Sequence, residues 1–407
     1  PRHTARQLKD VASQLYPMLR TGKIDVSGGH HDAGDYSKYT INSAALAHYL
    51  LFAMDSFPGV GELDNLGLPN SGDGIPDFLQ EAKWETDFLA KMQDTDGGFY
   101  FLVYPREREY EWGVLPDRGD AQVVWPKTTA VTASSVAALA QAGSSPLFKR
   151  HYPEVAARYM QQAELGWKFL TNAIARYGKD GSYQKITHYG HEYLHDDELA
   201  WAAAAMFTAT GNEAYHQALK SWFNPSDPAT LRWGWWRLYE SYGAAIRCYA
   251  FAARSGRLPA SKLDAAYLAK CEEQVRLCAQ ETLKRSLDTS YGSSFPAENK
   301  SYRSGGWYFS SERAFDMTVG YQLDPRPEYL AAVIENMNFE GGCNPANASF
   351  VTGLGWKRQR NVVHQYTIVS RQLLPPGGLP QGNIYQSYIY TDFYKGELTA
   401  MVYPSDT

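Results

Sequence analysis

Helical periodicity is the feature that most constrains the fold of this chain. Apolar residues recur at intervals of three and four, the pattern of a helix with one buried face, in ten segments of the 407 residues. The predicted helices lie near 42–57, 74–93, 127–142, 153–176, 196–210, 212–222, 236–255, 261–285, 308–322 and 326–338. Small residues crowd several of them, as in the run from Ala200 to Ala205, which suits closely packed helices. We therefore predict an all-α fold.

Long aromatic loops connect the predicted helices, which follow one another in consecutive pairs. Examples are 95–126, 177–195 and 286–306, and strand signals inside loops are short, as at 98–104. The composition does not change along the chain and no linker interrupts it, so the simplest interpretation is a single domain over residues 1–407. The pattern is typical of an α/α toroid, in which inner and outer helices alternate and long loops build a cleft at one end.

The bulk composition excludes several classes of protein. The net charge is −5 and neither sign forms a long run, whereas a nucleic-acid-binding surface is strongly basic. No apolar stretch approaches the roughly 20 residues that span a bilayer. The start of the chain has neither a Met nor a signal peptide, which is typical of a processed or trimmed form. The aromatic content of 14% suits a cleft that stacks flat, polar, ring-shaped ligands.

Four cysteines occur, at positions 248, 271, 278 and 343, and no two have the CxxC spacing of a metal or redox site. Cys271 and Cys278 are seven residues apart, about two turns along one helix face, which is too far for an unstrained disulfide. We predict buried free thiols.

The segment 25–39 carries the strongest chemical signal. Asp32 and Asp35 lie three residues apart on a glycine-rich turn, with His30 and His31 before them and Tyr36 after them. Glycine permits tight backbone paths, so such a turn can direct both carboxylates into one cleft. Paired carboxylates activate a water molecule or hold a metal, although aspartate also serves simply as a turn and cap residue.

Five blocks in the same order resemble glycoside hydrolase family 9, whose members are mostly cellulases. The blocks are residues 25–38, residues 70–98 with their Asp-Gly-Gly end, Thr128-Thr-Ala130, the helix start at 195–203, and residues 344–355. The resemblance implies an (α/α)6 barrel and hydrolysis of β-1,4-linked glycans with inversion, on a β-linked oligo- or polysaccharide. It also implies a secreted or periplasmic protein, with no nucleic-acid or membrane partner. Inversion places two carboxyl groups roughly 6.5–9.5 Å apart, which leaves room for the attacking water.

The resemblance assigns roles to individual residues. Asp35 matches the general base that takes a proton from water, and Asp32 would hold the same water. His364 follows the 351–355 block as the family's substrate-binding histidine does, although the surrounding sequence matches only in part. The alternative for His364 is a satisfied structural histidine.

The general acid is the weakest match. Glu397 is the only late candidate, but Gly396 replaces the usual Asn and Pro404 soon interrupts the segment. The ten predicted helices also fall two short of the twelve in the barrel. Two interpretations remain: Glu397 is the acid in a shortened end, or the chain is clipped at both ends and the acid lies beyond Thr407.

Further substrate contacts are expected from the cleft wall and its aromatic residues. The predicted substrate-binding residues are His30, His31, Tyr36, Trp125, Trp236, Trp307 and His364, with Tyr183, Trp235, Tyr302 and Tyr308 as other aromatic candidates. The two histidines are consecutive, which is not the spacing of metal ligands on one face. His30 stands where the family usually has Trp or Tyr, so we expect a ligand contact that differs from one to plain cellulose.

No cofactor is predicted to be required. Some family members bind calcium near the position of Asp197 and Glu198, but a further acidic ligand is replaced by Trp233-Gly234, which weakens such a site. The zinc site of some relatives uses cysteines near the N-terminus, and none occurs here before Cys248.

Three functions are compatible with these residues. The first is an endo-β-1,4-glucanase, which requires an open cleft. The second is an exo-acting β-glycosidase on oligosaccharides, such as an exo-β-glucosaminidase, which requires a blocked cleft and an acidic residue facing the sugar amine. The third is a non-catalytic carbohydrate-binding barrel, supported only by the weak acid position.

Overall fold

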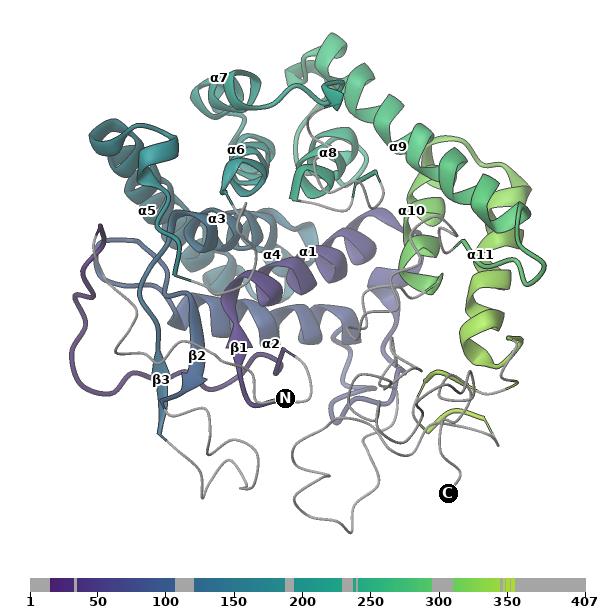
Figure 1. Ribbon diagram of the computed structural model, residues 1–407, viewed down its shortest axis with the longest axis horizontal. Coiled ribbons are helices and arrows are strands. Elements are labelled where there is room, and N and C mark those ends of the chain that lie inside the picture. Colours follow the sequence, from purple (N-terminus) through teal and green to yellow (C-terminus); the bar gives the residue numbers. More distant parts are fainter. Residues whose placement is uncertain are drawn as a thin grey trace, which may run out of the picture. The chain divides into compact units, whose positions relative to one another are not determined.

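The structure is a computed structural model that describes residues 15–32, 35–106, 121–186, 194–228, 237–238, 241–294, 310–344, 347, 349–351 and 353–355. The helices in these ranges are α1 (Thr40–Ser56), α2 (Asp77–Lys91), α3 (Thr129–Ser144), α4 (Pro146–His151), α5 (Pro153–Tyr177), α6 (Asp196–Thr210), α7 (Glu213–Trp222), α8 (Ser241–Phe251), α9 (Ala265–Leu287), α10 (Ser310–Leu323) and α11 (Pro327–Gly341). The strands are β1 (Lys38–Tyr39), β2 (Leu102–Pro105) and β3 (Gln122–Val124). Figure 1 labels these elements.

All ten predicted helices are present within a few residues of their expected bounds. The additional helix, α4, is only six residues long, too short to produce a recognisable period. It begins at Pro146 after Ser145, whose hydroxyl accepts a hydrogen bond from the Phe148 amide and so caps the helix. The predicted all-α class is therefore confirmed in the described ranges.

The chain divides into two compact units. The larger one takes its described residues from 4–232 and 238–272, and the smaller one from 233–237 and 273–407. In the larger unit α1, α3, α6 and α8 contact one another in succession, and α8 also contacts α1 (Figure 1). Helices α2, α5 and α7 pack against α1, α3 and α6 respectively. Inner and outer helices therefore alternate within this unit.

The sequence explains which helices are inner and which are outer. α3 is buried along its whole length, and α6 is buried from Asp197 to Thr208, so neither has a polar face. In contrast, α5 buries a residue every three or four positions, the pattern of a helix with one solvent face. Small residues set the spacing, since a Cβ on Gly166 of α5 would lie 2.5 Å from the Val136 side chain of α3.

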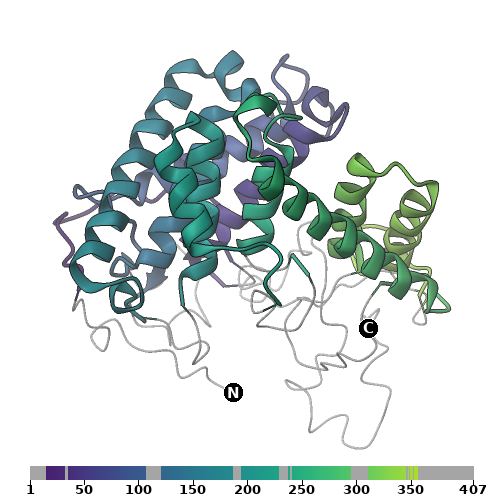
Figure 2. The same cartoon turned by 90° about the horizontal axis from the view of Figure 1, so that it is seen from above.

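The smaller unit contains the second half of α9 together with α10 and α11. Its core consists of Ala279, Leu283, Ala314, Met317, Tyr329 and Ala332. α10 and α11, yellow-green in Figure 2, pack against each other. The close approach of α9 and α10 depends on Gly320, where a Cβ would lie 2.3 Å from that of Ala279.

A small antiparallel sheet fixes the start of α1. β1 pairs with β2 in the register Lys38 to Val103, and β2 pairs with β3 in the register Val103 to Val124. β2 overlaps the strand expected at 98–104. Because β1 runs directly into α1, the turn that precedes β1 is held at the N-terminal end of that helix.

The cysteines agree with prediction in three of four cases. Cys248, Cys271 and Cys278 are buried free thiols, but Cys343 is exposed in the turn after α11, so its predicted burial is wrong. Among the described helices none is both long enough and apolar enough to cross a membrane.

Candidate active site

The turn before β1 brings Asp32 and Asp35 together. The Asp32 backbone amide donates to the Ser37 carbonyl at 2.8 Å, which closes the turn. The Ser37 hydroxyl in turn donates to Asp35 Oδ1 at 2.7 Å, which orients that carboxylate. The two aspartates predicted to act as a pair are therefore neighbours on one closed turn.

The surroundings of Asp32 control its ionisation. Its pKa lies above the ordinary value because burial of the carboxyl group disfavours the charged form, and the negative charge of Asp35 adds to this effect. The side-chain amide of Asn42 in α1 donates to Asp32 Oδ1 and opposes the shift. Although protein atoms crowd the carboxyl group, Asp32 as a residue reaches the surface, so solvent has access to the turn.

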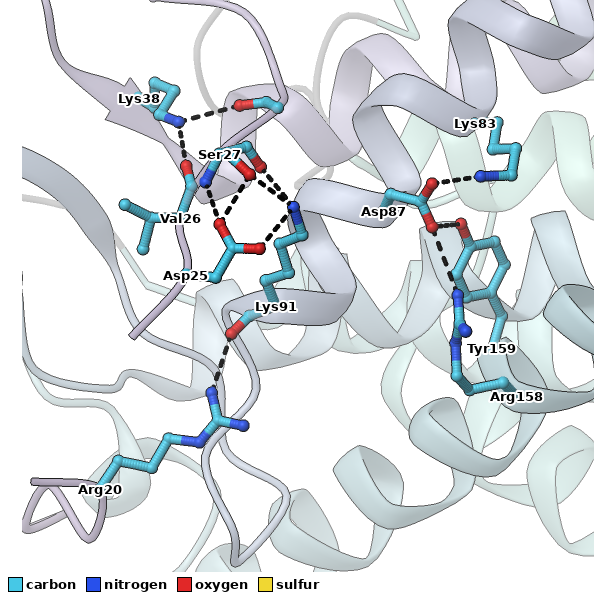
Figure 3. A network of polar contacts seen from close by, with 11 residues as sticks. Arg20, Asp25, Val26, Ser27, Lys38, Lys83, Asp87, Lys91, Arg158 and Tyr159 are labelled. Carbon is cyan, nitrogen blue, oxygen red and sulfur yellow. Dashed lines mark hydrogen bonds and ion pairs between the residues drawn. The ribbon is translucent and has the colours of Figure 1, made fainter. Parts of the chain in front are cut away.

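Helix α2 holds the segment that leads into this turn (Figure 3). Lys91 of α2 lies 3.0 Å from Asp25 Oδ2 and donates to the Ser27 carbonyl at 3.0 Å. The Ser27 amide and hydroxyl donate to Asp25 Oδ1, and these bonds, followed by Lys91, lower the pKa of Asp25. From β1, Lys38 donates to the carbonyls of Val26 and Gly28.

His30 contacts α2 through its polar atoms, while about half of its side chain is exposed, at 52%. Its Nδ1 and its backbone amide both contact Glu85 Oε1, and its Nε2 lies 3.1 Å from Glu81 Oε1. Both ring nitrogens of His30 are engaged by carboxylates of α2, and the ligand contact expected of this residue stays a prediction.

The other predicted contacts near the turn differ in exposure. His31 is exposed, and its ring centroid lies 5.8 Å from that of Tyr36, which is buried. Trp125 is only 4% exposed and packs edge-on against Tyr104. A stacking platform must present a ring face, so this placement does not support the sugar contact expected of Trp125.

Several predicted residues lie outside the described ranges. These are Glu397, Trp236, Trp307 and His364, together with Trp235, Tyr302 and Tyr308. Their roles stay predictions. Tyr183 is described and lies beside His195, with ring centroids 5.5 Å apart.

The inner helices α1 and α3 begin at the same end of the larger unit. Thr40, the first residue of α1, donates through its amide and hydroxyl to carbonyls in the segment 99–101. Thr132 in the first turn of α3 accepts a hydrogen bond from the Phe99 amide at 2.9 Å. One short segment therefore ties the two helix starts together, beside the turn that carries the aspartates.

The starts of α6 and α8 continue this arrangement. Thr129 of α3 lies 2.6 Å from Nδ1 of His195, which precedes α6. The Ser241 amide at the start of α8 donates to Asp197 Oδ2 of α6 at 3.0 Å. All four inner helices thus direct their N-termini to one end, where the positive ends of their dipoles favour anionic groups.

The calcium site that the sequence left open can be tested on Asp197 and Glu198. Both side chains are buried, and one oxygen of Asp197 is already used by the Ser241 amide. Calcium takes about six to eight oxygen ligands. In the part of the chain that the structure describes, no three His, Cys, Asp or Glu side chains form a group that could hold a metal ion. The described residues do not by themselves make a calcium site.

Asn42, Ser37, Glu85 and Lys91 were not singled out in the sequence. Ser37 and Asn42 could have been noticed, since they follow the Asp pair within one turn of a predicted helix start. Glu85 and Lys91 both lie on α2, but nothing in a single sequence pairs either residue with the segment before the turn.

Comparison with known proteins agrees with this arrangement. The family model for Glycosyl hydrolase family 9 matches residues 2–395. Endoglucanase D of Acetivibrio thermocellus is 27% identical over 342 residues, covering 82% of this chain and 51% of that protein. Endoglucanase C of Cellulomonas fimi is 28% identical over 387 residues, covering 88% of this chain and 33% of that protein. The chain therefore spans about half the length of the first relative and a third of the second.

Solved structures extend the likeness to the fold. A metagenome-derived family 9 endoglucanase superposes with a TM-score of 0.72 at 26% identity, over 91% of this chain and 65% of that one. AaCel9A in complex with cellobiose-like isofagomine gives 0.72 at 19% identity, over 95% and 71%. The fold class predicted from the sequence, the (α/α)6 class, is thereby confirmed. Taken with the family match over nearly all of its length, the likeness shows that the chain belongs to glycosyl hydrolase family 9.

Proposed function

We propose that this chain is the catalytic part of an inverting endo-β-1,4-glucanase. One observation carries the proposal: Asp32 and Asp35 lie on one closed turn, each with a hydrogen bond that orients it, in a member of family 9. The substrate class is supported by the relatives, which include endoglucanases from two bacteria.

The turn can supply the water-activating half of the reaction. Asp35 takes a proton from a water molecule as the water oxygen forms a bond to the anomeric carbon. Asp32 accepts the second hydrogen bond of the same water, and Asn42 favours the ionised form, which is the stronger acceptor. The glycosidic C–O bond breaks on the opposite face, where an acid protonates the leaving oxygen.

The assignment of the general acid rests on the sequence alone, because Glu397 lies outside the described residues. Glu397 is the candidate within this chain, with a residue beyond Thr407 as the alternative.

We propose further sugar contacts from His31, with Tyr36 packed behind it, and from His364, Trp236 and Trp307. No cofactor is proposed, since the reaction needs two carboxyl groups and a water molecule.

An exo-acting mode is the second candidate. The relatives include a cellulose 1,4-beta-cellobiosidase and a cellodextrinase, each 26% identical. Product analysis on cello- and chitosan oligosaccharides separates the modes, because release of only monomer from one chain end excludes endo cleavage.

A polymeric substrate lies outside the cell, so we propose a secreted or periplasmic location.

The proposal is tested by removing the base. Asp35→Asn should lower kcat roughly 100- to 10,000-fold, because the amide cannot take a proton, while the circular dichroism spectrum and Tm stay near wild type. Asp32→Asn should also lose most activity. Glu154→Gln, a carboxylate-to-amide change at an exposed position of α5, serves as the control and should leave kcat unchanged. Near-normal turnover by Asp35→Asn would show that the assignment is wrong.

A further inference from the structure

One face of α2 acts as a support for the segment that precedes the catalytic turn. Glu81, Glu85, Phe88 and Lys91 are spaced by four, three and three residues, so they share one face of the helix. Each of them contacts the segment 25–30. This face therefore follows the segment from Asp25 to His30, two residues before Asp32.

The fit between the segment and this face is close. Gly29 has φ +66°, and a Cβ there would lie 2.7 Å from the Phe88 ring. Lys38 lies over the same ring at 4.5 Å while its ammonium holds the Val26 and Gly28 carbonyls. Lys91 fixes Asp25 at the other end. The backbone from Val26 to Gly29 thus has little freedom relative to α2.

α2 is itself held firmly from its other side. Asp87 accepts a hydrogen bond from the Tyr159 hydroxyl of α5 at 2.7 Å and pairs with Lys83 (Figure 3). Tyr159 is fully buried. A helix anchored in this way to α5 can serve as a fixed reference for whatever its opposite face holds.

His30 is the last contact between the segment and α2 before Asp32, which lies two residues later. Three of its polar atoms are used: the backbone amide and Nδ1 contact Glu85 Oε1, and Nε2 contacts Glu81 Oε1 at 3.1 Å. The Glu85 side chain is completely buried, and its Oε2 has no hydrogen-bond partner among the described residues. A buried carboxylate needs a compensating cation, and His30 is the one in contact with it.

We infer that His30 is a positioning residue that holds the Asp32–Asp35 turn in its reactive place by clamping it to the buried Glu85 of α2, with the partly exposed Glu81 as a weaker outer contact. The inference rests on the proposed function, because it concerns the placement of the base and of its water. His30 touches neither the water nor the sugar in this scheme. It acts through the backbone that joins it to Asp32.

The clamp has a defined dependence on pH. The groups facing His30 are Glu85 and Glu81 of α2, and Lys38 of β1 lies near Glu85. The hydrogen bond to Glu85 is the largest cause that raises the pKa of His30, and the charges of Glu85 and Glu81 add to it. The imidazolium form, with both nitrogens donating, is therefore the clamped form. The clamp should loosen as the pH rises through this raised pKa.

Two matched sets of variants test the inference. His30→Asn places an amide nitrogen near the position of Nδ1 and keeps the contact to Glu85, whereas His30→Gln reaches only toward Glu81. With the full-length natural protein on cello-oligosaccharides, His30→Ala should lower kcat about 10- to 100-fold with KM within about twofold, because a small displacement of a catalytic group is costly. His30→Asn should retain more activity than His30→Gln. Glu85→Gln should resemble His30→Ala, while Glu81→Gln, at a partly exposed position, should cost less than about threefold.

A readout that does not depend on activity separates this inference from the proposed function. Hydrogen exchange of the segment 27–38, which contains the Asp32 amide bonded to Ser37, should speed up about tenfold or more in His30→Ala and Glu85→Gln. It should stay near wild type in Glu81→Gln. The pH at which the protection of these amides falls, after correction for the intrinsic dependence of exchange on pH, should also be lower in Glu85→Gln than in wild type.

The outcomes are distinct. If His30→Ala keeps wild-type kcat, or if exchange of 27–38 is unchanged in both His30→Ala and Glu85→Gln, the clamp is rejected even though the enzyme is active. If the wild-type protein hydrolyses no β-1,4-glucan while exchange responds as predicted, the proposed function fails and the clamp on the turn stands.

Discussion

At the scale of single residues, Asp32 illustrates how neighbours set the properties of one carboxyl group. Burial and the charge of Asp35 raise its pKa, and the Asn42 amide lowers it again. The balance matters to the proposed mechanism because an ionised Asp32 accepts a hydrogen bond from the attacking water more strongly than a protonated one. The sequence predicted the pair of aspartates but not Asn42, whose role depends on the start of α1 lying back over the turn.

Asn42→Ala tests this balance. Without the amide donor the ionised form of Asp32 is less stable, so its pKa rises and more of it is protonated at a given acidic pH. The acid limb of the kcat/KM profile should therefore move to higher pH, while activity near neutrality changes little. A profile that superposes on the wild-type curve would show that Asn42 does not control Asp32.

Gly29→Ala tests the close approach of the turn to α2. A left-handed backbone costs an alanine roughly 1–2 kcal/mol, and at Gly29 the new Cβ would also meet the Phe88 ring. Gly59 is the matched control, because its φ is also positive, at +82°, but nothing lies within 4 Å of a Cβ there. Urea denaturation should show Gly29→Ala to be less stable than Gly59→Ala by about 1 kcal/mol or more. Equal losses would mean that the Phe88 contact is not tight.

At the scale of elements, the inner helices share a buried polar network as well as small side chains. Arg247 of α8 donates to Nε2 of His48 in α1 at 3.1 Å, so Nδ1 carries the ring proton and donates to Gln141 of α3. Trp201 of α6 donates to the same Gln141 oxygen at 3.0 Å. Four inner helices are therefore linked through one histidine and one glutamine, and the histidine is neutral.

His48 should make the protein sensitive to acid. Burial, followed by the charge of Arg247, lowers its pKa well below 6.5 in the folded state. The unfolded chain binds a proton there below about pH 6.5 and the folded chain does not, so the free energy of unfolding falls as the pH falls. The slope from this group is about 1.4 kcal/mol per pH unit. His48→Gln should lower stability at pH 7.5 but reduce the slope between pH 6.5 and 5 by about that amount. An unchanged slope would contradict a neutral buried His48.

Helices leave a periodic signal in the sequence, whereas contacts between side chains of different elements leave none. Ten helices were predicted because an apolar face leaves a local period, and α4 was missed because six residues leave none. His30 was assigned to a ligand because of its place in the motif, yet its partners lie on a face of α2 some 55 residues later. Trp125 is predicted to bind substrate, but its side chain is buried. Which face meets which segment is decided by the packing of the whole unit, and no local pattern records it.

At the scale of the whole molecule, the family and the fold class agree with expectation, while the single domain over 1–407 stays a prediction. In the proposed function, the turn with Asp32 and Asp35 provides one half of an inverting site. The identity of the acid stays a prediction, since Glu397 lies outside the described ranges. The central claim is that Asp35 acts as a base toward water and forms no bond to the sugar.

The stereochemistry of the first product tests that claim most directly. Proton NMR of cello-oligosaccharide hydrolysis, recorded before the product mutarotates, distinguishes the two anomers. Attack by a water molecule that Asp35 activates predicts the α-anomer as the first signal. The β-anomer as the first signal would contradict the account, since retention requires an enzyme carboxylate to act as the nucleophile.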